Sequence, residues 1–481
     1  MAFMDLDHLL SEPTDAVFET LVAVGPVEDA PLTIDTAVVL GGSVAGLMAA
    51  RVLADHARRV VVVEADALPE EAAFRAGVPQ DQQVHTLLPA GQRWLERWMP
   101  GLTREAQDRG APFVGPEQAI TAFDGVPQAS EGEGYHLLAL SRPLLEVLIR
   151  GRVAALPNVS FLRGRATGLG YRDDAVSHVH YLAAGGDADD RDARTIEVDF
   201  VVDAMGRASR LAHWLDDSGY DRPALERLEA PINYATALFE RPVKFADLPT
   251  AGALALYTPR YPSGGVSVAA AQAIEDDRWL LMLMGYGDSR PGRTVDEMRS
   301  AVADLLPFFA TVAANEPVGD VVTYHQAESR RRHFTDLHRF PARLVSVGDA
   351  VASFNPIYGQ GMSSAALHAS CLATYLRGRP DLDTPARAFF ALQQVVVDAA
   401  WAVSAGGDAA RLDATNGVEV PEELRLQRWA MEQITAATLV DGAVTDAFLQ
   451  VTYMLRHPAT LADPALLARA VAAGERHRQT P

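Results

Sequence analysis

The segment that most constrains the fold covers residues 37–66. An apolar run leads directly into a glycine-rich turn at residues 41–46, a helix-like stretch follows, and a second apolar run ends at Glu64. Glycines in such a turn let the backbone approach a pyrophosphate, and the N-terminus of the following helix offers it free N–H groups. Glu64 comes about twenty residues after the turn, where an acidic side chain can accept hydrogen bonds from ribose hydroxyls. This order predicts a strand–turn–helix–strand unit that holds a dinucleotide.

The turn departs from the usual G-x-G-x-x-G pattern because Ser43 replaces its second glycine. Serine is small enough to allow close approach, so we interpret it as a tolerated variant. The turn does not decide between NAD and FAD as the nucleotide. The contacts predicted in this unit are Gly41, Gly42, Ser43, Ala45, Gly46 and Glu64.

Charge and cysteine content narrow the class of protein. The formal net charge of −21 argues against nucleic acid and against an anionic membrane surface as partners. The single cysteine, Cys371, excludes an internal disulfide, fits a cytoplasmic protein and lies in an apolar stretch where we expect a buried packing residue. The pair His178/His180 fits one face of a strand rather than a zinc site. No stretch reaches the roughly 18 apolar residues of a membrane helix, so we expect no stable membrane insertion.

The length of 481 residues corresponds to roughly three domains of ordinary size. Residues 1–35 precede the first strand, and either a docked helix or a disordered arm fits them. Residues from 382 onward are mostly helical by pattern, with breaks near Gly406-Gly407 and Pro421. The predicted parts are an N-terminal extension (1–35), a discontinuous Rossmann-like nucleotide-binding domain (36–120, 141–206 and 330–380), an inserted substrate-binding β-sheet domain (121–140 and 207–329) and a helical C-terminal region (381–481).

Two further motifs follow the glycine turn in the chain. The first runs from Asp203 through Gly206 to Arg210, and strands predicted over 177–182 and 195–202, around a polar turn at 185–192, precede it. The second places Asp349 at the end of a short apolar run and continues as Asn-Pro-Ile-Tyr-Gly-Gln-Gly-Met. A carboxylate at a strand end can accept hydrogen bonds from hydroxyl groups, and a glycine loop that opens a helix aims backbone N–H groups at an anion.

In this order and spacing, the three motifs resemble those of single-component flavin monooxygenases, the para-hydroxybenzoate hydroxylase-like superfamily. The resemblance covers residues 36–380 well and the tail more weakly, through Trp401 and Asp408. It implies an α/β fold with a Rossmann-like FAD-binding domain, an inserted β-sheet substrate domain and a helical C-terminal region. It also implies FAD as the cofactor and NADPH as a transient reductant.

The resemblance assigns roles to the second and third motifs. It implies that Asp349 accepts hydrogen bonds from the ribityl hydroxyls and that residues 359–362 face the pyrimidine edge, where a helix N-terminus stabilises the anionic reduced flavin. Pro356 would shape the loop beside that edge. The FAD contacts that the resemblance adds are Arg75, Arg142, Asp203, Gly206, Asp349, Pro356, Gly359, Gly361 and Met362.

Several of these positions leave alternatives open. Arg75 and Arg142 match family arginines beside the FAD, and a solvated arginine fits either position alone. Asp203 and Gly206 match the family's second nucleotide motif, which touches the pyrophosphate. The basic run 330–333 fits either a guide for the phosphate of NADPH or a solvated turn.

Two departures from the family pattern are expected near the active cleft. Family members often have His-x-His where this chain has Gln83 and His85, and many have an arginine at the position of Ala237; both positions are expected near the active cleft. His85 fits a proton donor or hydrogen-bond partner near the flavin, and it equally fits a satisfied core or surface histidine. Pro356 and Gly359 complete the expected flavin-edge environment.

Within the superfamily, residues 75–85 and 354–362 resemble a branch of bacterial natural-product enzymes that includes the polyether flavin epoxidases. This implies NADPH- and O2-dependent hydroxylation or epoxidation of a bulky apolar polyketide or isoprenoid, free or carrier-bound, with the protein supplying orientation and a dry pocket. Some relatives keep FAD yet act as polyketide cyclases, for example of the 4+2 type, which is the alternative. A flavin reductase or dehydrogenase acting on isoprenoids is a third possibility. The sequence leaves the oligomeric state open.

Overall fold

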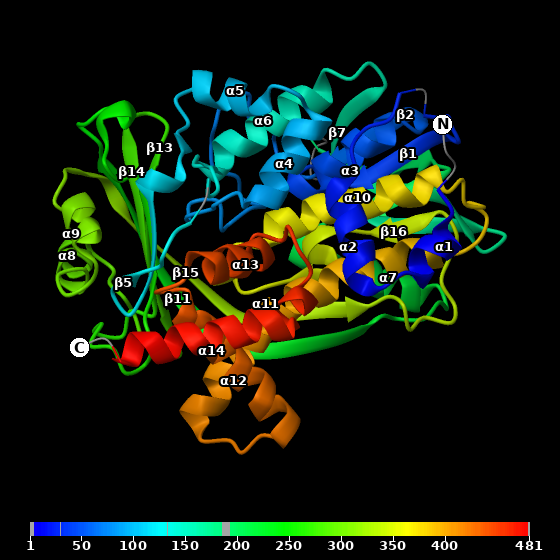
Figure 1. Cartoon of the computed structure of the whole chain (residues 1–481). Coiled ribbons are helices and arrows are strands. Elements are labelled where there is room, and N and C mark those ends of the chain that lie inside the picture. Colours follow the sequence, from blue (N-terminus) through cyan, green and yellow to red (C-terminus); the bar gives the residue numbers. More distant parts are fainter. Residues whose placement is uncertain (1–3, 29, 132, 185–192, 480–481) are drawn as a thin grey trace.

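Figure 1 shows the computed structural model of the chain, which describes residues 4–28, 30–131, 133–184 and 193–479. Within these ranges two large sheets lie beside each other, one on the right and one on the left of the view, and helices cover them. The polar turn expected at residues 185–192 lies outside the described residues.

The first sheet orders its strands β16-β10-β1-β2-β7-β8-β9. The strands from β16 to β7 are parallel, and β8 and β9 extend the sheet in antiparallel fashion. Consecutive residues at the end of β1 are fully buried, so both faces of this strand are covered, as is typical of parallel sheets. The strands are β1 (Ile34–Leu40), β2 (Ala57–Glu64), β7 (Val159–Arg172), β8 (Ala175–Ala183), β9 (Ala193–Glu197), β10 (Phe200–Asp203) and β16 (Leu344–Ser346).

The order of this sheet brings the three motifs together. Strands β1, β10 and β16 are neighbours and parallel, and each ends just before one motif: the turn at 41–46, residues 204–206 and residues 348–350. The helix α3 (Val44–Ala54) follows the first motif and packs against α10 (Gly361–Arg377), which follows the third. Helices α4 (Pro89–Trp98) and α6 (Arg142–Ala154) complete this layer. Ligands bind at such carboxyl edges of parallel sheets.

The second sheet faces the first with one side and two short helices with the other. Its order is β17-β15-β11-β14-β13-β12-β4-β5, and all but the β12–β4 pair is antiparallel. Successive side chains along its strands point to opposite faces of the sheet. One face packs against α8 (Val295–Ala301) and α9 (Pro307–Ala313), and the opposite face carries a second, separate hydrophobic cluster. The strands are β4 (Ala119–Phe123), β5 (Val126–Pro127), β11 (Ala224–Glu240), β12 (Gly252–Leu256), β13 (Val268–Ile274), β14 (Arg278–Tyr286), β15 (Pro317–His333) and β17 (Ala352–Ser353).

The N-terminal residues form two helices docked on the nucleotide-binding unit, which decides between the two alternatives that the sequence left open. In α2 (Thr14–Ala23), which follows α1 (Leu6–Ser11), the side chains of Val17, Phe18 and Leu21 are buried in the main core. Trp98 Nε1 also donates a hydrogen bond to the Val24 carbonyl at 3.3 Å. Residues 6–23 therefore pack as part of the folded body.

The C-terminal region is helical, as expected, but the break predicted near Gly406-Gly407 is wrong. Helix α11 (Arg387–Asn416) continues through both glycines and is followed by the C-cap Gly417, whose φ is +64°. A Cβ at Gly407 would lie 2.2 Å from the Tyr358 hydroxyl, so this glycine serves close packing rather than a turn. The break near Pro421 is observed, because Pro421 precedes α12. The remaining helices are α12 (Glu422–Ala437), α13 (Gly442–Thr452) and α14 (Pro464–Gln479).

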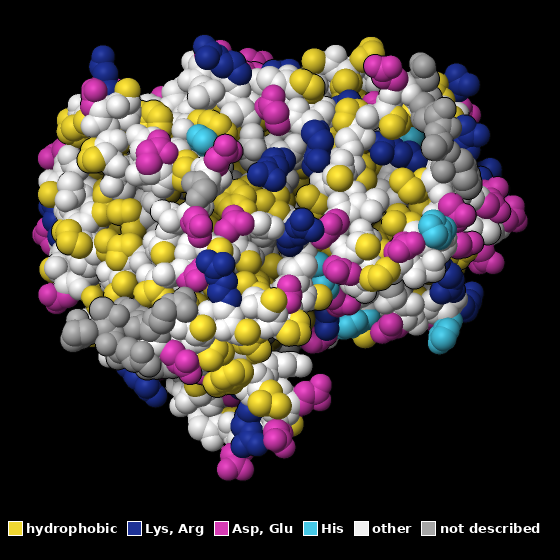
Figure 2. Space-filling model, viewed as in Figure 1, with side chains coloured by type: hydrophobic (Ala, Val, Ile, Leu, Met, Phe, Trp, Pro, Cys, Tyr) yellow, Lys and Arg dark blue, Asp and Glu magenta, His cyan; other side chains and the backbone are white. Residues whose placement is uncertain are grey.

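The C-terminal region contains one long apolar helix, α11, and one helix with exposed apolar side chains, α12. Helix α11 is long and apolar enough to cross a membrane, contrary to our reading of the sequence, yet 56% of its apolar window is buried within the protein, as in a core helix. Helix α12 projects from the body (Figure 1), and hydrophobic side chains are visible on the projection in Figure 2. Leu426, Trp429 and Met431 of α12 are exposed.

Other sequence expectations are corrected by strand pairing. The strand expected over 195–202 is split into β9 and β10, because the chain leaves one edge of the sheet at Glu197 and enters between β1 and β16 at Phe200. The basic run 330–333 is not a solvated turn but the end of β15, where Arg331 pairs with Glu226 at 2.7 Å. The proposed boundary between residues 329 and 330 therefore divides a continuous strand. The small elements are α5 (Leu102–Asp108), α7 (Leu211–Asp217), β3 (Phe113–Val114) and β6 (Leu137–Leu138).

Candidate functional site

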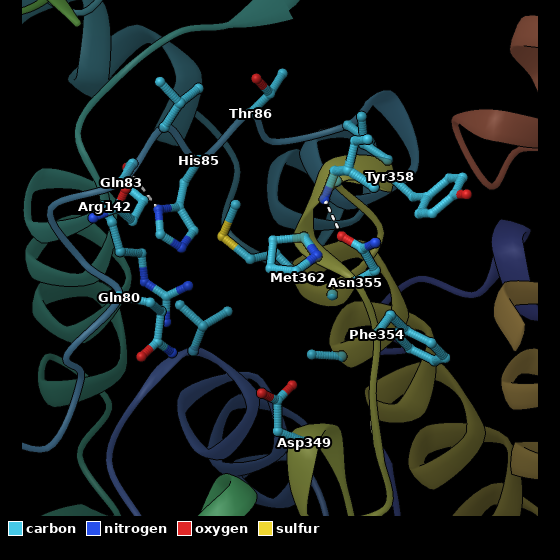
Figure 3. A pocket seen from close by; sticks show the side chains of 18 of the residues that line it. Gln80, Gln83, His85, Thr86, Arg142, Asp349, Phe354, Asn355, Tyr358 and Met362 are labelled. Carbon is cyan, nitrogen blue, oxygen red and sulfur yellow. Dashed lines mark hydrogen bonds between the residues drawn. The ribbon is translucent and has the colours of Figure 1, made fainter. Parts of the chain in front are cut away.

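A cavity of about 880 Å3 lies between the carboxyl edge of the first sheet and the facing side of the second. Figure 3 shows part of its wall, where Asp349 and Met362 of the third motif, Arg142 of α6 and His85 of the loop at 80–86 lie around the cavity. Three of the residues predicted from the sequence, Gly42, Gly46 and Asp203, do not line the cavity. Those that line it are Gly41, Ser43, Ala45, Glu64, Arg75, His85, Arg142, Gly206, Asp349, Pro356, Gly359, Gly361 and Met362.

The glycine turn is shaped by close backbone packing. Gly41 has a φ of +106°, and a Cβ on it would lie 2.5 Å from the Ala204 carbonyl oxygen. A Cβ on Gly46 would lie 1.9 Å from the Gly41 carbonyl oxygen, so any side chain there would displace the turn. No side chain caps the N-terminus of α3, which leaves its first N–H groups available to a phosphate. Gly46 thus shapes the site without lining it.

Glu64 lies at the end of β2, where the sequence places it, and its carboxylate lines the cavity. One oxygen accepts the Gly42 N–H at 2.7 Å and the other accepts the Asp66 N–H at 2.9 Å. These bonds fix the carboxylate against the turn. A carboxylate has about four acceptor positions, so two remain for ribose hydroxyls.

Arg75 and Arg142 are buried and form part of an ion cluster, so the reading of either as a solvated arginine is wrong. Arg75 pairs with Glu146 at 2.7 Å and with Asp66 at 3.2 Å. Arg142 donates to the Ser43 hydroxyl at 2.9 Å, and burial lowers the pKa of its guanidinium. Our sequence reading missed Glu146, although it follows Arg142 by four residues on one helix face, which is a recognisable signal.

Asp203 is a structural residue, contrary to the expectation that it touches the pyrophosphate. Its side chain is buried and accepts hydrogen bonds from the Met205 N–H at 3.1 Å, the Ser209 hydroxyl at 2.7 Å and the Ser346 hydroxyl at 3.1 Å. Burial raises the pKa of this carboxyl. The carboxyl therefore ties the loop after β10 to β16, and the neighbouring Gly206 forms the cavity wall.

Asp349 points into the cavity in Figure 3, as the third motif predicts. It follows Gly348, which has a φ of +62° and would bring a Cβ within 2.6 Å of Ala45. The Gly348 N–H donates to Nδ1 of His368 at 2.9 Å. Burial lowers the pKa of His368 to about 3, so this ring is neutral and stays an acceptor. His368 could not be recognised from the sequence, because nothing in its local pattern marks a buried histidine as a backbone acceptor.

The loop at residues 355–359 is held from the C-terminal region. Asn355 Nδ2 donates to both oxygens of the buried Asp408 carboxylate at 2.9 Å, and Asn355 Oδ1 accepts the Ile357 N–H at 3.1 Å. Tyr286 donates to the same carboxylate at 2.8 Å. The loop ends at Gly359 with a φ of +67°, and no side chain caps the N-terminus of α10 that follows. Backbone N–H groups there are available to an anionic ligand.

His85 lies on the cavity wall with its ring between Gln83 and Met362 (Figure 3). Its Nδ1 donates to the Gln83 carbonyl oxygen at 2.9 Å, because a carbonyl can only accept. Burial lowers the pKa of His85 to about 4, so the ring is neutral near pH 7 and Nε2 keeps an acceptor lone pair. Gln83 also lines the cavity, as expected, whereas Ala237 belongs to the core on the opposite face of β11, which corrects its expected place near the cleft.

Two comparisons with known sequences bear on this arrangement. The sequence profile of a family described as FAD binding domain matches residues 34–378. The chain belongs to this FAD-binding family. A relative in Mycobacterium tuberculosis (strain ATCC 25618 / H37Rv), Protein Rv3254, is 37% identical over 355 residues, which are 72% of this chain and 73% of the relative.

Solved structures share the fold of this FAD-binding chain. The p-nitrophenol 4-monooxygenase PnpA of Pseudomonas putida DLL-E4 aligns with a TM-score of 0.58 at 16% identity, over 90% of this chain and 98% of its own. PqsL of Pseudomonas aeruginosa, described as a probable FAD-dependent monooxygenase, aligns with a TM-score of 0.56 at 22% identity, over 79% and 96%. These alignments show that the chain shares the fold of the two proteins, which confirms the α/β fold class inferred from the sequence, and the family match confirms the predicted FAD-binding domain.

The residues of the cavity fit FAD. The close packing around the glycines of the turn at 41–46 leaves no room for larger side chains there. The N-termini of α3 and α10 have no side-chain caps. Nε of the buried Arg142 has no hydrogen-bond partner among the described residues. Glu64 and Asp349 offer carboxylate oxygens on the same wall. Across the parts of the chain that the structure describes, no group of three His, Cys, Asp or Glu side chains is placed to hold a metal ion.

Proposed function

We propose that the protein is a monooxygenase that uses FAD, NADPH and O2 to hydroxylate or epoxidise a bulky apolar polyketide or isoprenoid. In the overall reaction one oxygen atom of O2 enters the substrate, and the other becomes water with two electrons from NADPH and protons from solvent. The observation that supports the proposal is the shared cavity, in which the FAD motifs form one wall and an apolar sheet face forms the other.

The wall opposite the FAD motifs supports a bulky apolar substrate. Leu254, Ala270, Met282 and Met284 line it, and all lie on the sheet face that belongs to a separate hydrophobic cluster. Methionine side chains adapt to irregular apolar shapes, and a cavity of this kind excludes water. The net charge of −21 supports a small molecule, rather than nucleic acid, as the partner.

The chain's own residues orient the reactants. FAD, when bound, supplies the redox chemistry. Glu64 and Asp349 would hold its hydroxyl groups, and the open N-terminus of α10 would stabilise negative charge. The neutral His85 can accept a hydrogen bond or a proton at Nε2 from a group in the cavity.

One observation favours a second candidate, an FAD-containing cyclase of a polyketide pathway. Gln83 occupies the position where many family members have a histidine, and it lines the cavity. An amide cannot exchange protons as an imidazole does, so the site has one acid–base group fewer.

The test is the response of the bound flavin to NADPH under anaerobic conditions. A monooxygenase loses its oxidised-flavin absorbance, faster in the presence of substrate, and then incorporates labelled oxygen from O2 into product. A flavin that NADPH does not bleach, together with product formed without O2, would replace this proposal by the cyclase.

A further inference from the structure

The buried side-chain atoms that line the cavity and lack a hydrogen-bond partner within the described residues include three donors on uncharged side chains: Gln83 Nε2, Tyr234 Oη and Gln272 Nε2. All three residues line the cavity, and each is more than nine-tenths buried. A buried polar group without a partner is costly, so such groups are rare unless a ligand satisfies them. Three of them around one cavity indicate a built recognition surface.

The two glutamines are held by threonines in a defined orientation. The Thr236 hydroxyl donates to Gln83 Oε1 at 2.5 Å, and the Thr86 hydroxyl donates to Gln272 Oε1 at 3.2 Å. The carbonyl end of each amide is therefore satisfied, and the amino end is left as a free donor. Thr86 and Gln83 are seen on the upper part of the cavity wall in Figure 3.

The strand register places these groups on one face of the second sheet. Tyr234 belongs to the cluster that faces the cavity, and Thr236 is two residues further along β11 on the same side. Gln272 follows Ala270 of the same cluster by two residues along β13. The free donors thus share a surface with the apolar side chains of Met282 and Met284, which belong to the neighbouring strand β14.

This surface carries no charge among its described residues. Every cavity residue contributed by β4, β11, β12, β13, β14 and β15 is apolar or a neutral polar residue. Charged lining residues come from the first sheet and its loops, such as Asp349, or from the far rim, such as Glu131 and Asp446. A carboxylate or ammonium group placed against this wall would be buried without a partner of opposite charge.

We propose that the substrate is an uncharged molecule that presents carbonyl or hydroxyl oxygen atoms to Gln83, Tyr234 and Gln272. Its apolar body then lies against the methionines of β14. The inference rests on the proposed function only in placing the substrate in this cavity, because it concerns binding and not turnover.

The experiment measures binding of three molecules of similar shape to the FAD-loaded protein in the absence of NADPH, by isothermal titration calorimetry. The probes are 2-acetonaphthone, 2-ethylnaphthalene and 2-naphthoate, which are a neutral ketone, a hydrocarbon and a carboxylate. We expect the ketone to bind about tenfold more tightly than the hydrocarbon, and the carboxylate to bind at least about a hundredfold more weakly than the ketone.

Two variants assign the preference to the named groups. Tyr234→Phe removes a hydroxyl that has no partner among the described residues, so we expect the thermal midpoint of the protein to stay unchanged or to rise. The affinity for the ketone should fall about fivefold to tenfold, while the affinity for the hydrocarbon stays unchanged. Gln272→Met has the same selective effect on the ketone. Tyr171→Phe, in β7 and outside the cavity, is the matched control and changes neither affinity.

Several results would overturn the proposal: equal binding of ketone and hydrocarbon, tightest binding of the carboxylate, no binding of any probe, or a ketone preference that survives both cavity substitutions. A protein that shows the predicted ketone preference but is not bleached by NADPH would instead contradict the monooxygenase function and leave the substrate class standing.

Discussion

Replacing Asp408 tests how the C-terminal region supports the flavin-edge loop. Its carboxylate, fully buried on α11, accepts hydrogen bonds from Asn355 at 2.9 Å, from Tyr286 at 2.8 Å and, more weakly, from Tyr358 at 3.3 Å. Burial raises the pKa of this carboxyl, while the hydrogen-bond donors oppose the shift. In Asp408→Ala the donors lose their common acceptor, and the loop at 355–359 loses its anchor.

The expected size of the effect follows from the bonds that remain. Two close donor groups, Asn355 and Tyr286, lose their acceptor, at a cost of roughly 1–3 kcal/mol for each donor that stays buried. Asn355 Nδ2 keeps a 3.2 Å hydrogen bond to the Tyr286 oxygen. Part of this loss of stability is offset, because the variant no longer has to desolvate a buried carboxylate on folding. We expect a net loss of about 3 kcal/mol in the free energy of unfolding, and weaker FAD binding because the loop lines the cavity.

The assay is urea unfolding with and without FAD, combined with FAD titration followed by quenching of flavin fluorescence. Asp413→Asn is the matched control, since Asp413 lies on the same helix, is partly exposed and pairs with Arg428 at 2.6 Å; we expect it to cost less than about 1 kcal/mol. The reasoning is refuted if Asp408→Ala unfolds like this control and binds FAD with the affinity of the unchanged protein.

Three other substitutions test the remaining parts of the site. Gly46→Ala forces a Cβ to within 1.9 Å of the Gly41 carbonyl oxygen, so we expect apoprotein after purification, and a fully FAD-loaded Gly46→Ala protein would contradict the packing argument. Asp349→Ala removes a carboxylate from the cavity wall and should raise the Kd for FAD, whereas wild-type affinity in a titration would remove Asp349 from the cofactor site. His368 binds a proton near pH 6.5 when unfolded but only near pH 3 when folded, so its protonation favours unfolding and stability falls as the pH drops below 6.5. Between pH 7 and pH 5 this lowers the free energy of unfolding by about 2 kcal/mol. Urea unfolding should therefore show a smaller loss of stability over that interval for His368→Gln than for the unchanged protein. An equal loss in both proteins would contradict the assignment.

Local sequence patterns predicted the parts of the site whose chemistry lies in one short segment. The turn at 41–46 with Glu64, and the pairing of Asp349 with the loop that follows it, lie where the sequence puts them, because strand, turn and helix are adjacent in the chain. The strand order could not be derived in the same way. In the folded sheet β10 lies between β1 and β16, and Asp203 at the end of β10 is buried there rather than exposed to the cavity.

Unlike Glu146, three residues that the sequence analysis missed or marked only faintly have partners that are distant in the chain. His368 binds Gly348 across 20 residues, Asp408 binds Asn355 across 53, and Gln83 meets Thr236 across 153. Each acts on a motif or on the substrate wall through the tertiary fold, and so carries no periodic or local signal.

The same distinction explains why the family is clearer than the substrate. FAD binds through backbone geometry that glycines and helix N-termini provide, and such geometry leaves a strong pattern in a sequence. The substrate wall consists of single side chains on alternate positions of separate strands, where Tyr234 and Gln272 look like any other strand residues. Their role in recognition depends on which polar atoms stay without a partner after folding. For the two glutamines, Gln83 and Gln272, this is decided by the hydrogen bonds from Thr236 and Thr86. On the proposed recognition surface, the free amide donors depend on hydrogen bonds between the loop at 80–86 and the strands of the second sheet, and the substitutions at Tyr234 and Gln272 test oxygen recognition separately from apolar burial.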